Sequence, residues 1–382
     1  MIFTKKTNLL ILAAAPISGA FQMIQDIVTH IDKQKFNMFI AHKPDYVNWE
    51  EEARNVSDAG ALLVPLRGAR LFDIRGFWDL ITIINKRKVD ILHCWDVMGV
   101  PARIIGKLMG MKVIDEWANP PPIFPSDISP KYYYLNYYTS FLVDGYISCS
   151  KEILDRYMEQ RPVVLTGRKR SAIYNCLELE TISVKKNDHK SIRSCFGISE
   201  RDIVLANIGY FNKQKAQWDL LHAFADIRRE HEHVRLIIVG WGKLEKYLKD
   251  VAESLGLSKQ VVFTGKRMRK EVFEILSITD LFVLSSHWEG FGIVLTEAMA
   301  AGKPVVATNT DGAREVVEDG KTGILTPIGH PKLLAETISA LLNQPERMAD
   351  MGRRGRERVR RLFDCQRFIR GYEAFYQSVL RP

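Results

Sequence analysis

The amino-acid sequence predicts an α/β fold with two doubly wound, parallel-sheet domains in tandem. The chain has 382 residues, more than one ordinary core accommodates, and 46% of them are apolar, as in soluble globular proteins. Short apolar runs alternate with helical patterns along almost the whole length. A polar stretch near the middle interrupts this alternation, which then starts afresh. These observations favour two α/β domains over a single one.

Six apolar runs in the first half have the length of buried strands. Amphipathic stretches such as 77–85 and 100–109 lie between them and predict helices. Strands that alternate with helices form parallel sheets covered on both faces. The predicted strands are Leu9–Ala14, Phe36–Ala41, Ala61–Pro65, Val89–Cys94, Lys112–Asp115 and Gly145–Cys149.

The first apolar run has two interpretations. Lys5 and Lys6 precede it and small residues end it, which resembles a signal peptide. A buried first strand is the alternative, because a Gly-containing turn at 16–19 and a helical apolar stripe at 21–31 follow. We favour the strand. No apolar stretch approaches the ~18–20 residues of a membrane span, so we expect a cytoplasmic protein, at most peripheral at the inner face of the plasma membrane.

The domain boundaries follow from the polar segment 179–201, which is rich in Lys, Ser and Asn and lacks periodicity. We expect an N-terminal domain at 1–178, an interdomain connection at 179–201, a C-terminal domain at 202–362 and a final helix at 363–382. The tail from Glu346 to Leu380 reads as all-helical. The strands predicted for the second domain are Ile203–Ile208, Val234–Val239, Val261–Thr264, Leu281–Ser285 and Pro304–Ala307.

Charge and cysteine content narrow the function classes. A net charge of +9 favours acidic partners such as phosphorylated substrates, anionic lipid surfaces or nucleic acid without choosing among them. The five cysteines are scattered and include no Cys-x-x-Cys pair. This predicts free thiols and argues against a disulfide framework or a structural zinc site. The chain also lacks an Asp-x-Asp sequence, so a metal held by such a pair is not expected, and we expect no cofactor. The arginines at 353–361 are interpreted as a solvated helix face, and nucleic acid is not expected as a partner.

The segment from 280 to 327 carries the clearest chemical pattern. A predicted strand leads into a loop with Gly290 and Gly292, and a helix follows at 293–301. Glycines before a helix N-terminus make an anion site, because exposed amides and the helix dipole favour phosphate. Glu289 lies on this loop and Glu297 about two helical turns further on. An isolated pair of this kind is usually solvated, so the surrounding sequence decides its meaning.

A second candidate element follows the first strand of the second domain. Lys213 and Lys215 lie in the loop 207–215, just before a predicted helix. A lysine at the carboxyl end of a strand can neutralise a leaving diphosphate. Both lysines have an ordinary alternative as solvated loop residues.

At residues 289–300 the sequence resembles the Glu-x7-Glu motif of retaining GT-B glycosyltransferases of the family 4 type. The similarity continues in register through Gly302–Thr308, Asp311–Val317 and Asp319–Gly323. The resemblance implies two Rossmann-like domains facing a cleft. The first would bind the acceptor and the second the nucleotide-sugar donor. The final helix would pack back on the N-terminal domain.

The resemblance also implies roles for individual residues of the second domain. Glu289 would lie against the donor sugar, and Glu297 would bind the ribose. The amides of Gly290, Phe291 and Gly292 would hold the diphosphate or the sugar.

Three further positions take their roles from the same resemblance. Lys215 matches the family's phosphate-binding lysine. Relatives often carry an arginine where this chain has Tyr210, so the diphosphate would rest on Lys215 alone or with Lys213. Gly19 corresponds to a glycine loop that approaches the donor phosphate or the acceptor, although a simple tight turn explains it equally well.

One departure from the family lies near residues 113–118. Many relatives have a histidine after this strand, placed near the sugar, and none stands here. Asp115, Glu116 or Trp117 would take its place, and we choose Glu116 as the catalytic candidate. His93, at the end of another strand, is an alternative.

Together these residues predict a retaining transfer of a hexose or N-acetylhexosamine from a nucleotide-sugar, favoured as a UDP-sugar with GDP-sugars open. The acceptor implied by the family is a glycan or a lipid-linked molecule in surface polysaccharide or lipopolysaccharide synthesis, with peripheral contact to anionic membrane. Two alternatives stay open: a GT-B epimerase or phosphorylase, and a non-catalytic protein that binds sugar nucleotides.

Overall fold

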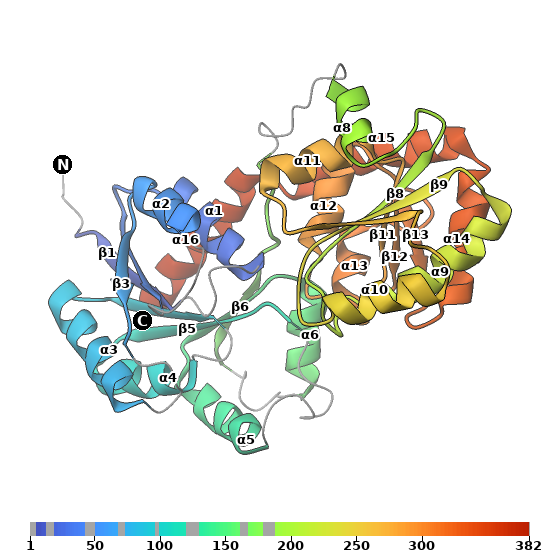
Figure 1. Cartoon of the computed structure of the whole chain (residues 1–382). Helices are drawn as coiled ribbons and strands as arrows, with labels where there is room; N and C mark the ends of the chain where they lie inside the picture. The colour runs from blue at the N-terminus through green and yellow to red at the C-terminus, as the bar shows by residue number, and fades with distance from the viewer. Residues whose placement is uncertain are drawn as a thin grey trace. The chain divides into compact units, whose positions relative to one another are not determined.

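The computed structural model describes residues 5–12, 19–42, 50–67, 73–95, 99–119, 130–160, 167–178 and 188–381. The chain divides into two compact units, each with a parallel β-sheet (Figure 1). Unit 1 comprises Met1–Cys176 and Cys365–Pro382, and unit 2 comprises Leu177–Asp364. The predicted α/β class with two doubly wound domains is confirmed.

The sheet of unit 1 has the strand order β3-β2-β1-β4-β5-β6-β7. The order reverses between β1 and β4, and helices connect the strands because parallel neighbours need crossovers. The elements of unit 1 are β1 Thr7–Leu12, α1 Gly19–His30, β2 Phe36–His42, α2 Glu50–Asp58, β3 Leu62–Pro65, α3 Ile74–Arg87, β4 Ile91–Trp95, α4 Gly99–Leu108, β5 Lys112–Trp117, α5 Pro130–Thr139, the short 3-10 helix Ser140–Leu142, β6 Gly145–Ser148, α6 Lys151–Gln160, β7 Lys169–Ala172 and α16 Cys365–Leu380.

The first apolar run is a strand of this sheet. β1 pairs with β2 on one side and with β4 on the other, and Leu9, Leu10 and Ile11 are fully buried. A segment paired on both sides is part of the core, so the strand interpretation is confirmed. The predicted continuation at 13–14 and most of the turn at 16–19 lie outside the described residues.

The sheet of unit 2 has the strand order β10-β9-β8-β11-β12-β13 and reverses between β8 and β11. Side chains from α9, α10 and α14, among them Phe224, Leu248 and Ile338, build the core against one of its faces. The elements of unit 2 are α8 His189–Cys195, β8 Ile203–Ile208, α9 Gln217–Glu230, β9 Val234–Val239, α10 Glu245–Ser254, β10 Val261–Gly265, α11 Arg269–Ile278, β11 Leu281–Leu284, α12 Ile293–Ala300, β12 Val305–Thr308, α13 Asp311–Val316, β13 Gly323–Thr326, α14 Pro331–Leu342 and α15 Pro345–Leu362.

Three elements differ from the sequence expectation. Edge strands β7 and β13 were not predicted, because each has only four residues and neither is a fully buried apolar run. Helix α8 lies inside the segment predicted as the interdomain connection, and it belongs to unit 2. None of its residues is buried, so it has no apolar stripe to reveal it. Arg193 instead anchors it through hydrogen bonds to the carbonyls of Ser199 and Asp202.

The tail is helical as predicted, with α15 in unit 2 and α16 in unit 1. The five cysteines all lie in the described part of the chain, where none is in a disulfide, and Cys365 Sγ lies 2.6 Å from Cys176 Sγ. Among the described helices, none combines the length and the apolar character that crossing a bilayer requires.

Candidate functional site

The loop between β11 and α12 lies where the strand order of unit 2 reverses. β11 pairs with β8 on one side and with β12 on the other. Parallel sheets bind ligands outside the carboxyl ends of their strands at such a reversal. Gly292, just before α12, has a φ of 86°, a left-handed conformation that glycine adopts without strain. The start of α12 therefore presents backbone amides and the positive end of a helix dipole at this edge.

Lys215 and Glu289 form a largely buried ion pair beside this loop. Lys215 Nζ lies 2.5 Å from Glu289 Oε1, and the two side chains are 16% and 5% exposed. Ser286 donates its hydroxyl proton to the same carboxylate oxygen at 2.6 Å. The partners are 74 positions apart in the sequence and come from the loops after the neighbouring strands β8 and β11. The structure thus brings the two predicted residues together at the strand ends.

The backbone around Lys215 is held in an unusual conformation. The next residue, Ala216, has a φ of 44°, which is strained for a residue with a Cβ. The Ser285 hydroxyl lies 3.1 Å from the carbonyl oxygens of both Lys215 and Ala216. At Gly209, an added Cβ would lie 3.2 Å from Lys215 Cγ. This small residue leaves room for the aliphatic part of the lysine, and strain of this kind is typical of functional sites.

Cross-links brace the loop of Lys215 against the loop of Glu289. His287 donates its backbone N–H to the Gln214 carbonyl at 2.8 Å, and Gln214 Nε2 donates to the Trp288 carbonyl at 3.1 Å. The His287 ring nitrogen Nε2 lies 2.8 Å from Asp219 Oδ2. The two loops therefore form one braced assembly, in which the ammonium and carboxylate groups have fixed positions.

Gly312 packs directly against the backbone of the Glu289 loop. Its backbone N–H donates to the Glu289 carbonyl at 3.1 Å. A Cβ at this position would lie 2.5 Å from the backbone nitrogen of Phe291, far inside van der Waals contact. Only glycine fits here without a shift of the Glu289 loop.

The other predicted donor-site residues of unit 2 lie on the same elements. Gly290, Phe291 and Gly292 are buried within the loop. Glu297 is half-buried on α12, and Lys213 is exposed. The structure does not test their roles, which stay predictions.

Tyr210, which stands where relatives often have an arginine, is 41% exposed. Its ring meets that of Trp241 edge-on, with centroids 5.5 Å apart. An aromatic pair thus occupies the place where the family resemblance suggests a cation.

The two predicted site residues of unit 1 lie in different surroundings. Gly19 is the first residue of α1. Glu116 is fully buried: its Oε2 lies 3.0 Å from His93 Nε2, and its Oε1 accepts a hydrogen bond from the Tyr372 hydroxyl at 2.7 Å. Burial raises the pKa of the Glu116 carboxyl above its ordinary value. This placement gives the predicted catalytic role of Glu116 no support, since the side chain has no surface for a substrate to touch.

The partners of Glu116 were missed by sequence analysis. Tyr372 and Tyr376 come from α16, and the Tyr376 hydroxyl lies 3.0 Å from His93 Nδ1. Burial raises the pKa of both phenols well above their ordinary value. Nothing local in the sequence links α16 to a strand more than 250 residues away, because only the folded chain brings them together.

Ser286 and Gly312 are further positions without a predicted role. Ser286 stands directly after a strand, and Gly312 lies inside the segment that resembles the family, so both carried a signal that went unused.

Within the described part of the chain, no group of three or more His, Cys, Asp or Glu residues is arranged to hold a metal ion. The site contains the Lys215 ammonium and the amides at the start of α12, which can interact with an anion, and the Glu289 carboxylate, which can accept hydrogen bonds from hydroxyl groups.

The architecture defines the class of fold. The chain superposes on the Anabaena protein HepE, solved in complex with UDP-glucose, with a TM-score of 0.84 over 97% of this chain and 99% of that one, at 19% identity. Two α/β units with parallel sheets and this superposition define a GT-B fold.

Sequence comparison then shows which family the chain resembles. Residues 188–358 match the family described as Glycosyl transferases group 1, so this part of the chain is similar to that family. N-acetyl-alpha-D-glucosaminyl L-malate synthase of Bacillus anthracis is 34% identical over 58% of this chain and 57% of that protein. Alpha-monoglucosyldiacylglycerol synthase of Streptococcus pneumoniae is 24% identical over 86% of this chain and 76% of that protein. The chain thus spans little more than half the length of the first relative.

Proposed function

We propose that the protein is a retaining glycosyltransferase that needs no metal. It moves a hexose or N-acetylhexosamine from a nucleotide-sugar, favoured as a UDP-sugar, to a glycan or lipid-linked acceptor in surface polysaccharide synthesis. The observation that carries the proposal is the Lys215–Glu289 pair at the strand-order reversal of unit 2, beside the N-terminus of α12.

In this proposal the site acts by electrostatic stabilisation of the leaving group. Negative charge develops on the nucleoside diphosphate as its bond to the sugar breaks. Lys215 and the amides at the start of α12 stabilise that charge from positions fixed before the reaction, and such preorganised groups are usually a large part of catalysis. The braced loops and the strained backbone after Lys215 keep the ammonium in place.

Glu289 orients the donor sugar. Its carboxylate accepts hydrogen bonds and lies on a buried loop whose backbone Gly312 fixes. Its contact with Lys215 also keeps a buried carboxylate paired while the donor site is empty. When a diphosphate binds, the ammonium gains a second anionic partner.

The choice of donor and acceptor rests on similarity. The superposed HepE structure contains UDP-glucose. One relative is named for an N-acetylglucosaminyl transfer and another for a glycolipid product. These names support a UDP-hexose or UDP-N-acetylhexosamine donor and leave the acceptor to experiment.

A product assay with purified protein tests the proposal. Transfer from UDP-sugars is measured with and without acceptors, which separates a transferase from an epimerase or a non-catalytic binding protein. The variant Lys215→Ala should lower the transfer rate by roughly 10²–10³, the usual effect of losing a charge-stabilising group. The matched control is Lys246→Ala, since the Lys246 side chain is 90% exposed on α10. Transfer by Lys215→Ala at the rate of the control would refute the assignment.

The nucleotide is tested by thermal shift with UDP, GDP and ADP. A ligand that binds only the folded state raises the unfolding temperature. We expect the largest shift with UDP. A larger shift with GDP would keep the transferase and correct the donor.

A further inference from the structure

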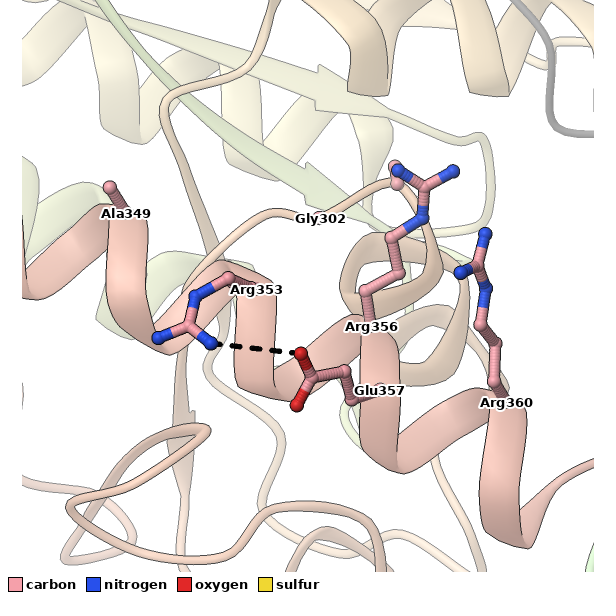
Figure 2. Close-up of a pocket in the computed structure, with 7 residues that line it drawn as sticks. Gly302, Ala349, Arg353, Arg356, Glu357 and Arg360 are labelled. Atoms are coloured by element: carbon pink, nitrogen blue, oxygen red, sulfur yellow. Dashed lines mark ion pairs between the residues drawn. The ribbon is translucent and has the colours of Figure 1, made fainter.

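A hollow of about 530 Å³ lies on unit 2 beside α15 (Figure 2). Ala301 and Gly302, which line it, follow the end of α12 that is remote from the Glu289 loop. This volume is within the range of ~300–1,000 Å³ typical of small-molecule sites. The lining residues are Ala301, Gly302, Ala349, Arg353, Arg356, Glu357 and Arg360. We call this hollow the arginine pocket.

The arginine pocket has a fixed wall. α15 packs closely on the turn after α12, and a Cβ at Gly352 would lie 2.1 Å from the Gly302 carbonyl oxygen. A Cβ at Gly355 would lie 3.3 Å from Met299 Cγ, so this second glycine also allows close approach. Close packing through these two glycines sets where the arginines of α15 project.

The charges of the pocket are not balanced. Three guanidinium groups and one carboxylate line it. Arg353 is paired, because it contacts Asp350 and its Nη1 lies 3.7 Å from Glu357 Oε1 (Figure 2). Arg356 and Arg360 have no acidic partner among the residues that the structure describes. Two positive charges therefore remain uncompensated.

These two arginines are one helical turn apart, and Figure 2 shows both side chains extending in the same direction from α15. Like charges at this spacing destabilise a helix. A bound anion between the guanidinium groups would turn the repulsion into attraction. Their planar N–H groups match phosphate oxygens in a two-pronged geometry, which makes arginine a preferred phosphate ligand.

The other lining residues limit which class of ligand the arginine pocket can bind. They include no aromatic residue, and their only apolar side chains are those of Ala301 and Ala349. A nucleobase or an acyl chain would find nothing to stack or pack against. A small polar molecule that carries a phosphate group fits the lining better.

The pocket is separate from the proposed donor site. α12 runs from the Glu289 loop at Ile293 to Ala300 next to the pocket, and its eight residues span about 12 Å. Lys215 and Glu289 do not line the pocket. We infer that the arginine pocket is a second anion site of unit 2, which binds a phosphate group through Arg356 and Arg360, either from a soluble molecule or from a lipid headgroup.

The experiment compares three variants of the full chain. Arg356→Gln/Arg360→Gln removes the two uncompensated charges. Arg354→Gln/Arg361→Gln removes the same number of charges from α15 outside the pocket lining. Lys215→Ala leaves the arginine pocket intact while it changes the donor site. All the substituted arginines are exposed, and circular dichroism and the unfolding temperature check that each variant folds as the wild type does.

Binding is measured in two arms. Inorganic phosphate is titrated by calorimetry, and phosphatidylcholine vesicles with or without phosphatidic acid are used in sedimentation. We expect the wild type, Arg354→Gln/Arg361→Gln and Lys215→Ala to bind in at least one arm, with Arg356→Gln/Arg360→Gln at least about tenfold weaker. Binding in the phosphate arm identifies a soluble ligand, and binding only to phosphatidic acid vesicles identifies a headgroup. Absence of binding in both arms, or equal loss in the two arginine double variants, overturns the inference.

Discussion

Unit 1 and unit 2 each carry an acidic residue near the carboxyl end of a parallel strand, and the surroundings of the two residues differ. In unit 1, Glu116 is fully buried and contacts His93 and Tyr372. In unit 2, Glu289 is also buried, but it lies on a loop and pairs with Lys215, whose side chain is 16% exposed. Both sheets reverse their strand order once, so the difference does not come from topology.

The difference comes from the elements that each side chain contacts. In unit 1, α16 supplies Tyr372, which donates a hydrogen bond to Glu116 Oε1, and Tyr376, whose hydroxyl lies 3.0 Å from His93 Nδ1 inside the core. In unit 2, two braced loops hold Lys215 against Glu289. A carboxylate near a strand end is thus held inside the core in one unit, and in the other it lies on a loop in an ion pair with a lysine.

The largest expected effect is on catalysis in unit 2. Lys215→Ala and Glu289→Gln should each lower kcat/KM for transfer by roughly 10²–10³. The double variant should lose no more than about tenfold further, because residues that act as one unit give strongly non-additive losses. Product-formation kinetics on all four proteins measure this. Fully multiplicative losses would mean that the two residues act independently.

The next effect is on stability in unit 1. Glu116→Ala leaves the Tyr372 hydroxyl and a His93 nitrogen without their buried partner, and we expect a loss of about 3 kcal/mol in the free energy of unfolding. Urea denaturation measures the loss, with Glu159→Ala at an exposed position of α6 as the control. UDP affinity of the folded variant should equal that of the wild type. A stable Glu116→Ala protein with abolished transfer would instead restore Glu116 as a catalytic residue.

A smaller effect is expected from the packing beneath the donor loop. Gly312→Ala places a Cβ 2.5 Å from the Phe291 nitrogen, and overpacking of this kind costs about 1–3 kcal/mol. Transfer should fall as well, because the Glu289 loop must move. The control is Gly355→Ala, whose Cβ meets only the flexible Met299 side chain at 3.3 Å. Thermal unfolding and the product assay are measured for both, and equal stability of the two variants would contradict the account.

The smallest effect is a pH dependence of stability. The folded-state pKa of Glu116 is raised above its ordinary value of 4.5 by burial, so the folded chain holds its proton more tightly than the unfolded chain. The associated stability is fully present below pH 4.5 and is lost as the pH rises through the raised pKa. Glu116→Gln should lack this decline. Unfolding free energies measured across the acidic to neutral range test this, and parallel curves for the two proteins would contradict it.

The sequence was sufficient for elements whose signal is local. Buried apolar runs such as Leu281–Leu284 define strands by themselves, and the glycines at 290 and 292 define the loop before α12. Lys215 and Glu289 each follow a strand, which made them candidates, and the resemblance of the surrounding residues to a known family selected them from the other loop residues.

The remaining features depend on contacts between distant parts of the chain. β7 and β13 are stabilised by pairing at a sheet edge rather than by their own composition. Glu116 follows the same local pattern as a site residue, and only the tyrosines of α16 reveal that it is buried. The uncompensated charge on Arg356 and Arg360 likewise depends on the folded structure, because it follows from the contacts of Asp350 and Glu357 with Arg353. Local patterns therefore locate strand ends but do not show which distant residues contact the side chains there.

Calorimetric titration of UDP into the wild type and into Lys215→Ala tests the central claim most directly. If the ammonium beside Glu289 holds the leaving diphosphate, the variant should bind UDP about 10–100-fold more weakly, the range expected for a lost charge-assisted hydrogen bond. Equal dissociation constants for the two proteins would show that the diphosphate binds elsewhere.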